Sequence, residues 1–371
     1  MKIPTNAVQQ SMRSRLLARV LMVWCVLNGA LVSAQQLADM LVWENLPPIP
    51  DELGFAGSFA GVHNDALIVA GGANFPKPVW ENDKVWHDRI FVLTGLAQNP
   101  QWNQVGSLDK PRAYGAAVST PDGVVCMGGS DSEAIYRDVF LLSWSATGQI
   151  TQQAYPPLPR PCASGAATLL GDTIYLAGGQ STAALDSAMT NLWALDLSQR
   201  NDPAKFVWRE MPECPGPARA FNLISHQQNG YHDCVYVMSG RNQSGDEVAF
   251  LRDVWEYSPT TARWRRRSDS PRCLMAGTSM NVGQSHILAL GGATEELYFK
   301  VEELKDEHPG FIKQALAYHT ITDTWVEAGS IPQNLVTTIA VRWRGDIFIP
   351  GGEVRPRVRS NSVFRVTSHY D

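Results

Sequence analysis

The sequence predicts an all-β chain folded as a six-bladed β-propeller. A short apolar strand ending in a glycine pair, or a near-copy of one, recurs six times: Ala66 to Gly72, Val124 to Gly129, Thr173 to Gly179, Cys234 to Gly240, His286 to Gly292 and Asp346 to Gly352. Successive second glycines are 57, 50, 61, 52 and 60 residues apart. A strand of small residues, such as AGSFAGV or ASGAATL, precedes each doublet strand. Small side chains suit the innermost strands of a propeller, where the sheets converge on one axis.

A period near 50 residues with this glycine doublet is typical of kelch repeats, whose blades have four strands. After each doublet come a variable stretch and a β-rich third strand, and four repeats then end on a strand led by tryptophan, at Trp102, Trp208, Trp264 and Trp325. The second repeat has Ile150 to Gln153 in place of such a strand, so we expect its outer strand to be weaker.

The last blade needs a strand from the other end of the chain. The sixth repeat reaches Asp371 without a fourth strand, whereas LVWENLPPIPDELG around Trp43 reads like the segments around Trp102 and Trp208. We therefore predict that the segment near Trp43 pairs with Ser362 to Thr367 and closes the last blade. Closure removes the two unpaired edges that an open ring of sheets would leave.

The first 34 residues are typical of a secretory signal peptide. They contain four basic residues, no acidic residue and an apolar core from Val20 to Val32, with Val-Ser-Ala before Gln35. We expect residues 1–34 to be cleaved and residues 35–371 to form the propeller, in the periplasm or secreted, with no membrane attachment. Cleavage leaves 27 Lys and Arg against 36 Asp and Glu, a net charge of −9. This charge disfavours nucleic acid and anionic membranes as partners.

Five cysteines follow the predicted signal peptide: Cys126, Cys162, Cys214, Cys234 and Cys273. They show no CxxC or Cys/His spacing of the kind that binds zinc, so no metal site is predicted. An oxidising compartment permits disulfides, but their odd number argues against full pairing, and the connectivity stays open.

The loops after the doublets and the loops entering the first strands emerge on one face of a propeller. Three of the former are long: Ala73 to His87, Ala293 to Lys313 and Glu353 to Asn361. Insertions on one face of a repeat protein usually mark its binding face. Within the second insertion, Glu295 to Glu307 has helical spacing and is predicted as a helix.

Two stretches resemble a known family. GFAGSFAGVHNDALIVAGGANFP at Gly54 to Pro76 with PRAYGAAV at Pro111 to Val118, and GGEVRPRVRSNSVF at Gly351 to Phe364, are similar to the kelch-type sialic acid mutarotases, also called N-acetylneuraminate epimerases. The order of the stretches is rotated here, which implies a circularly permuted branch of the family. A closed ring tolerates such a rotation because the same strands pack together.

The resemblance implies interconversion of the α and β anomers of N-acetylneuraminate or a related sialic acid. The expected partner is a small-molecule sugar acid, and no cofactor or metal is expected. Glu353 and Arg359 match the proposed catalytic Glu and Arg of the family. Opening the hemiketal ring requires one proton to leave the anomeric hydroxyl and another to reach the ring oxygen, which a general acid or base aided by a positive group can do.

Five further residues are candidates for substrate binding. Arg112, Arg219 and Arg272 each follow a proline-containing loop that enters a first strand, where a guanidinium could take the substrate carboxylate bidentately. The same recurrence also fits arginines that brace neighbouring blades. Asn74 and Arg241 lie just beyond their doublets and are chosen on location alone. With Arg359, the three recurrent arginines predict an electropositive channel mouth.

Two other classes of function are alternatives to a mutarotase. A kelch propeller can be a non-catalytic module that binds a protein or glycan partner, and the fold alone does not decide this. A copper oxidase of the galactose oxidase type needs Tyr and His ligands. The histidines here fall mostly in short turns or strands, which disfavours this function.

Overall fold

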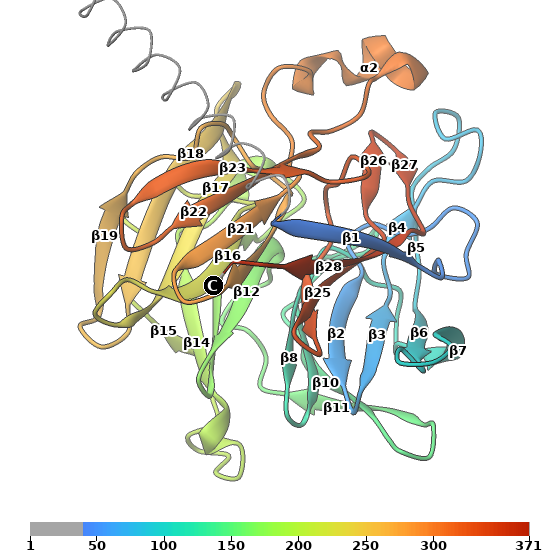
Figure 1. The fold of residues 1–371 in the computed structure, drawn as a ribbon, viewed down its shortest axis with the longest axis horizontal. Helices are drawn as coiled ribbons and strands as arrows, with labels where there is room; N and C mark the ends of the chain where they lie inside the picture. The colour runs from blue at the N-terminus through green and yellow to red at the C-terminus, as the bar shows by residue number, and fades with distance from the viewer. Residues whose placement is uncertain (1–39, 371) are drawn as a thin grey trace, which may run out of the picture.

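The computed structural model describes residues 40–370, and the predicted signal peptide lies outside them. Within this range six four-stranded antiparallel sheets form the blades of a propeller, which confirms the predicted fold (Figure 1). No helix among residues 40–370 has both the length and the apolar character needed to cross a bilayer.

The first strand of each blade lies at the axis and the fourth at the rim. Blades 1 to 3 consist of β2 (Phe59–His63), β3 (Ala66–Ala70), β6 (Arg89–Thr94) and β7 (Gln101–Ser107); β8 (Ala116–Thr120), β9 (Gly123–Met127), β10 (Val139–Trp144) and β11 (Ile150–Tyr155); and β12 (Ala163–Leu170), β13 (Thr173–Gln180), β14 (Leu192–Asp196) and β15 (Arg209–Glu210). Blades 4 to 6 consist of β16 (Leu223–Gln228), β17 (Asp233–Ser244), β18 (Glu247–Ser258) and β19 (Arg263–Arg267); β20 (Thr278–Val282), β21 (His286–Leu290), β22 (Gln314–His319) and β23 (Thr324–Ser330); and β24 (Val341–Trp343), β25 (Asp346–Pro350), β28 (Val363–Ser368) and β1 (Leu41–Leu46).

The predicted closure of the last blade is confirmed. Strand β1 pairs antiparallel with β28 from Leu41 opposite Ser368 to Leu46 opposite Val363. Figure 1 shows this blue strand beside the dark red end of the chain. Strand β1 therefore covers the edge of β28 that the sixth repeat would leave unpaired.

Tryptophans in or next to the outer strands tie blades 1, 3 and 4 to the blade before each of them. The indole N–H of Trp102 donates to the carbonyl of Pro47, just after β1, at 2.8 Å. Trp208 bonds the carbonyl of Pro156 and Trp264 that of Pro212 in the same way, at 2.9 and 2.8 Å. The shared geometry explains why the segment after Trp43 reads like the other outer strands.

The outer strand of blade 2, expected to be weaker, is as long as most of the others. Strand β11 of blade 2 has six residues, whereas β15 of blade 3 has two, Arg209–Glu210. Pro212 follows β15 closely, and proline cannot donate to a strand ladder. All five cysteines in residues 40–370 are buried and free.

Three additions project from the doublet side of the propeller, the upper side of Figure 1. They are the ribbon β4 (Ala73–Asn74) with β5 (Val85–Trp86), the ribbon β26 (Glu353–Arg355) with β27 (Val358–Arg359), and the segment containing α2. The predicted helix over Glu295 to Glu307 is only one α-helical turn, α2 (Val301–Leu304), between the 3₁₀ turns Tyr298–Lys300 and Lys305–Glu307.

Candidate functional site

A closed ring of backbone hydrogen bonds surrounds the channel mouth. Each member stands at the entry to a first strand and donates its N–H to the carbonyl of its counterpart in the preceding blade, at 2.6 to 2.8 Å; the six are Gly57, Tyr114, Ser164, Phe221, Ala276 and Thr337. All have φ between 57° and 69°. Five of them are not glycine, and the left-handed conformation costs such residues about 1–2 kcal/mol each. The inter-blade hydrogen bonds offset this cost and fix the mouth rigidly.

A second tier of equivalent positions lies against this ring. The residue directly after each doublet pairs with the residue before each ring member; the six are Ala73, Ser130, Gln180, Arg241, Ala293 and Glu353. Only Arg241 and Glu353 are charged. The propeller thus places one guanidinium and one carboxylate at equivalent positions around the same opening.

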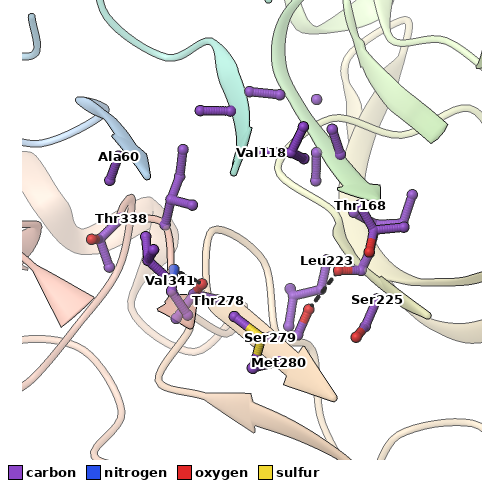
Figure 2. A pocket seen from close by; sticks show the side chains of 18 of the residues that line it. Ala60, Val118, Thr168, Leu223, Ser225, Thr278, Ser279, Met280, Thr338 and Val341 are labelled. Atoms are coloured by element: carbon purple, nitrogen blue, oxygen red, sulfur yellow. Dashed lines mark hydrogen bonds between the residues drawn. The ribbon is translucent and has the colours of Figure 1, made fainter. Parts of the chain in front are cut away.

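The ring opens into a central cavity of about 440 Å³, lined by the first strands of all six blades. Figure 2 shows the small side chains that surround it, including Ala60, Val118, Thr168, Thr278 and Thr338. All six ring residues line this cavity. The candidate site is the rim where the cavity meets the second tier.

Glu353 and Arg359 are brought together by the ribbon of β26 and β27. They are direct cross-strand partners, and Oε1 of Glu353 lies 2.5 Å from Nη1 of Arg359. The side chain of Arg359 is 3% exposed and that of Glu353 16%. The arginine is thus enclosed by protein, while the carboxylate keeps one accessible side.

The local sequence accounts for this arrangement. Gly352 has φ 109°, and a Cβ there would lie 2.9 Å from the carbonyl oxygen of Val336, so only glycine fits. Pro356 and Arg357, with φ 67°, follow the pattern of a type II turn, which returns the chain to place Arg359 opposite Glu353. The backbone N–H of Arg357 donates to Oε1 of Glu353 at 2.9 Å. The carboxylate is therefore held by the turn and by the opposite arm of its own hairpin.

Arg359 links this hairpin to blades 1 and 2. Its Nε donates to the carbonyl of Ala73 at 3.2 Å, its Nη2 donates to the hydroxyl of Tyr114 at 3.3 Å, and its Cζ lies 5.0 Å from the Phe75 ring centre. Burial by itself disfavours the charge, but Glu353 and Tyr114 more than compensate, so the pKa of Arg359 is raised. Arg359 stays charged at any pH at which the protein is folded.

Arg241 is the other cation of the rim. Its Cζ lies 4.5 Å from the Phe221 ring centre and 4.8 Å from that of Tyr298. Within residues 40–370 it forms no ion pair, and its buried Nε has no hydrogen-bond partner. Burial lowers the pKa of Arg241, and the charge of Glu353 counters this in part. A desolvated guanidinium without a counter-charge is suited to bind an anion.

The three recurrent arginines do not form the expected electropositive mouth. Nη2 of Arg112 lies 2.9 Å from Asp138, the guanidinium of Arg219 bonds both oxygens of Asp253 at 3.0 and 2.7 Å, and Arg272 bonds Gln314 at 2.8 Å. Arg112 and Arg219 are fully buried. These partners lie in or just before the third strand of the same blade. The arginines therefore brace strands within one blade, and not neighbouring blades as the alternative interpretation of the sequence had it.

Asn74 is also engaged inside the protein. Its side chain is 2% exposed, donates to the carbonyl of Gly54 at 3.1 Å and meets Nε2 of His87 at 2.9 Å. It supports the base of the β4–β5 ribbon rather than facing the rim. No group of three or more His, Cys, Asp or Glu able to hold a metal ion occurs in residues 40–370.

Two rim residues were missed at the sequence level. Tyr114 is a ring member that contacts Arg359, and Lys84 stands directly before β5 with its Nζ 4.9 Å from the Tyr114 ring centre. An alignment of the six segments that lead into the first strands would have placed Tyr114 at the channel mouth. No sequence pattern could have placed Lys84, because it sits in a loop without a counterpart in the other blades.

The comparisons with known proteins agree with the fold. The family model of the N-acetylneuraminate epimerases matches residues 25–150 and 155–308; the hairpin with Glu353 and Arg359 lies outside these two stretches. The solved structure of YjhT superposes with a TM-score of 0.66 at 15% identity, over 87% of this chain and 97% of that one.

Curated relatives match over a shorter span. An N-acetylneuraminate epimerase of Yersinia enterocolitica is 36% identical over 104 residues, which is 24% of this chain and 25% of the relative. One from Brucella suis is 37% identical over 117 residues, 27% of this chain and 29% of the relative. The matches thus span between a quarter and a third of these relatives' length. The family model, however, covers most of the chain. The chain belongs to the N-acetylneuraminate epimerase family.

Proposed function

We propose that this protein is a mutarotase that interconverts the α and β anomers of N-acetylneuraminate or a related sialic acid. The observation that carries the proposal is the Glu353 carboxylate, held by buried Arg359 at the channel mouth with one side accessible. Family membership favours this chemistry over a non-catalytic binding role.

Glu353 is the group that exchanges a proton with the sugar. As a base it takes the proton of the anomeric hydroxyl while the bond from the anomeric carbon to the ring oxygen breaks; that oxygen keeps the electron pair and takes up a second proton, giving the open-chain ketone. As an acid it returns the proton when the ring closes on the other face of the carbonyl. A positioned proton-transfer group of this kind contributes roughly 10²–10⁴-fold.

Arg241 supplies the selectivity for an acid sugar. A carboxylate at the rim would give its guanidinium the direct ion pair that it lacks among residues 40–370. Phe221 and Tyr298 hold the guanidinium in place. A neutral hexose offers no such partner, so we expect it to be a poor substrate.

Two further features of the proposal come from the sequence. The signal-like residues 1–34 support a periplasmic or secreted location. The rotated order of the two family-like stretches supports a circularly permuted branch.

The test follows anomer interconversion by proton NMR. A sialidase releases the α-anomer of N-acetylneuraminate, and its decay is recorded with and without the protein; glucose mutarotation is recorded in parallel. We expect acceleration for the sialic acid and none for glucose. An unchanged sialic acid rate would refute the proposal, and binding of a sialylated glycan without acceleration would favour the non-catalytic alternative.

A further inference from the structure

Tyr114 is the one ionisable side chain in the backbone ring at the channel mouth. The other members are Gly57, Ser164, Phe221, Ala276 and Thr337. Tyr114 lines the cavity and also contacts the hairpin that carries Glu353. It therefore connects the enclosed space with the proposed proton-transfer group.

The ring of Tyr114 is fixed on two sides. At Gly57 a Cβ would lie 2.6 Å from Cδ1 of Tyr114 and 2.8 Å from its N, so the ring packs onto a position where no side chain fits. Lys84 lies against the same ring, with Nζ 4.9 Å from its centre. This lysine is also near the rings of Trp86 and Phe75, at 5.3 and 5.8 Å.

The guanidinium of Arg359 contacts both the carboxylate of Glu353 and the hydroxyl of Tyr114. Nη1 of Arg359 lies 2.5 Å from the Glu353 carboxylate, and Nη2 donates to the Tyr114 hydroxyl at 3.3 Å. Since Arg359 is the donor in the second contact, the hydrogen of the phenol is not used in it. The phenol hydrogen is left free to donate to a ligand at the mouth.

Positive charge surrounds the Tyr114 oxygen and ring. The groups facing the residue are Arg359 from β27 and Lys84 from the β4–β5 ribbon, with Glu353 beyond the shared guanidinium. Within residues 40–370 Lys84 forms no ion pair or side-chain hydrogen bond. Arg359, in hydrogen-bond contact with the phenol oxygen, is placed to stabilise negative charge that develops there during a reaction.

We infer that Tyr114 is the second proton-transfer residue of the site, acting on the ring oxygen while Glu353 acts on the anomeric hydroxyl. The inference rests on the proposed mutarotase function. When Glu353 removes the anomeric proton, the C–O bond to the ring oxygen breaks, and that oxygen keeps the electron pair and takes the proton of Tyr114. The products are the open-chain ketone, a protonated Glu353 and a Tyr114 phenolate.

Reclosure restores both groups. After rotation about the bond next to the carbonyl, the phenolate takes the hydroxyl proton as this oxygen attacks the other face, and Glu353 returns its proton to the carbonyl oxygen. No net proton, electron or co-reactant is consumed. Two groups acting at once avoid a charged sugar intermediate, which Glu353 alone would not.

The test compares Tyr114→Phe with wild type and with Glu353→Gln in the NMR assay. Phenylalanine keeps the ring between Gly57 and Lys84 and removes only the hydroxyl. We expect kcat to fall about 100-fold with KM within twofold, because the ring oxygen loses its proton donor while the packing of the ring is kept. Tyr136→Phe is the matched control, since the Tyr136 ring also lies near a lysine and an arginine, at 4.5 and 4.4 Å, and should keep the wild-type rate.

The outcomes distinguish a failure of the proposed function from a failure of the proposed role of Tyr114. A wild-type protein that does not accelerate interconversion overturns the proposed function and this inference with it. An active wild type, an inactive Glu353→Gln and a fully active Tyr114→Phe leave the function standing and overturn the role of Tyr114 alone. A loss in Tyr114→Phe that appears only in KM also overturns it.

Discussion

Glu353 and Arg359 face each other across the β26–β27 ribbon, with 2.5 Å between Oε1 and Nη1. The arginine is the more deeply buried partner and also bonds Ala73 and Tyr114. The carboxylate therefore has a fixed position and orientation before any ligand arrives. Such preorganisation is what electrostatic catalysis requires.

Arg359→Lys tests the bridging role of the guanidinium. Lysine keeps the charge but cannot bond Glu353, Ala73 and Tyr114 together, because its ammonium is a single point. We expect kcat to fall by about 100-fold, and stability to fall by roughly 1–3 kcal/mol, less than for a fully buried pair because Glu353 is partly exposed. Urea unfolding and the NMR assay measure the two effects. Arg344→Lys, at an exposed pair with Asp65, should change neither; equal effects in both variants would contradict the account.

Arg241→Gln tests the binding of the substrate carboxylate. Loss of a charge-assisted hydrogen bond worth about 1.5–3 kcal/mol should raise KM roughly 10- to 100-fold, with kcat nearly unchanged. Saturation curves from the NMR assay separate the two constants. Arg263→Gln on outer strand β19 of the same blade is the control, since Arg263 is exposed and far from the axis in the blade order. An unaltered KM in Arg241→Gln would remove this residue from the site.

Gly57→Ala tests the packing of Tyr114. The new Cβ meets the Tyr114 ring and backbone, and φ is 69°. Gly245→Ala is a matched control because Gly245 has φ 58° and nothing within 4 Å of the added Cβ. Both variants carry the backbone cost of about 1 kcal/mol. We expect a larger loss of stability and a loss of kcat only in Gly57→Ala; identical thermal unfolding and rates for the two variants would count against the proposed packing.

Replacing Leu41–Leu46 with a Gly/Ser segment tests closure of the ring. The change removes the strand that covers β28 and leaves a free edge, so we expect a lower unfolding temperature and concentration-dependent aggregation. Glu44→Gln, on the exposed side of β1, is the control and should behave as wild type. Light scattering and thermal unfolding give the result. A replaced protein as stable as wild type and as resistant to aggregation would show that closure by β1 is dispensable.

The sequence predicted those features that follow from strand order. The glycine doublets gave the six blades, and the orphan segment around Trp43 gave the partner of β28. The family resemblance singled out Glu353 and Arg359, and the register of the ribbon places them opposite each other. All three features depend on the pairing of backbone strands, which follows the same pattern in each repeat.

Side-chain direction was beyond the same reasoning. Arg112 and Arg219 stand at the entries to first strands, yet their long side chains turn to Asp138 and Asp253 and not toward the mouth. The carboxylates in or just before the third strand of the same blade decide this side-chain direction. Only the folded chain shows that they lie close to the arginines. The left-handed ring and the approach of Lys84 to Tyr114 likewise depend on contacts between blades.

The central claim is that Glu353 accelerates the interconversion of sialic acid anomers, and one measurement tests it most directly. Proton NMR follows freshly released α-N-acetylneuraminate in the presence of wild type or Glu353→Gln, both verified to be folded, with EDTA present because the proposed proton transfers need no metal. We expect wild type to accelerate formation of the β-anomer well above the spontaneous rate and Glu353→Gln to return it to near that rate. A Glu353→Gln variant as fast as wild type would contradict the account.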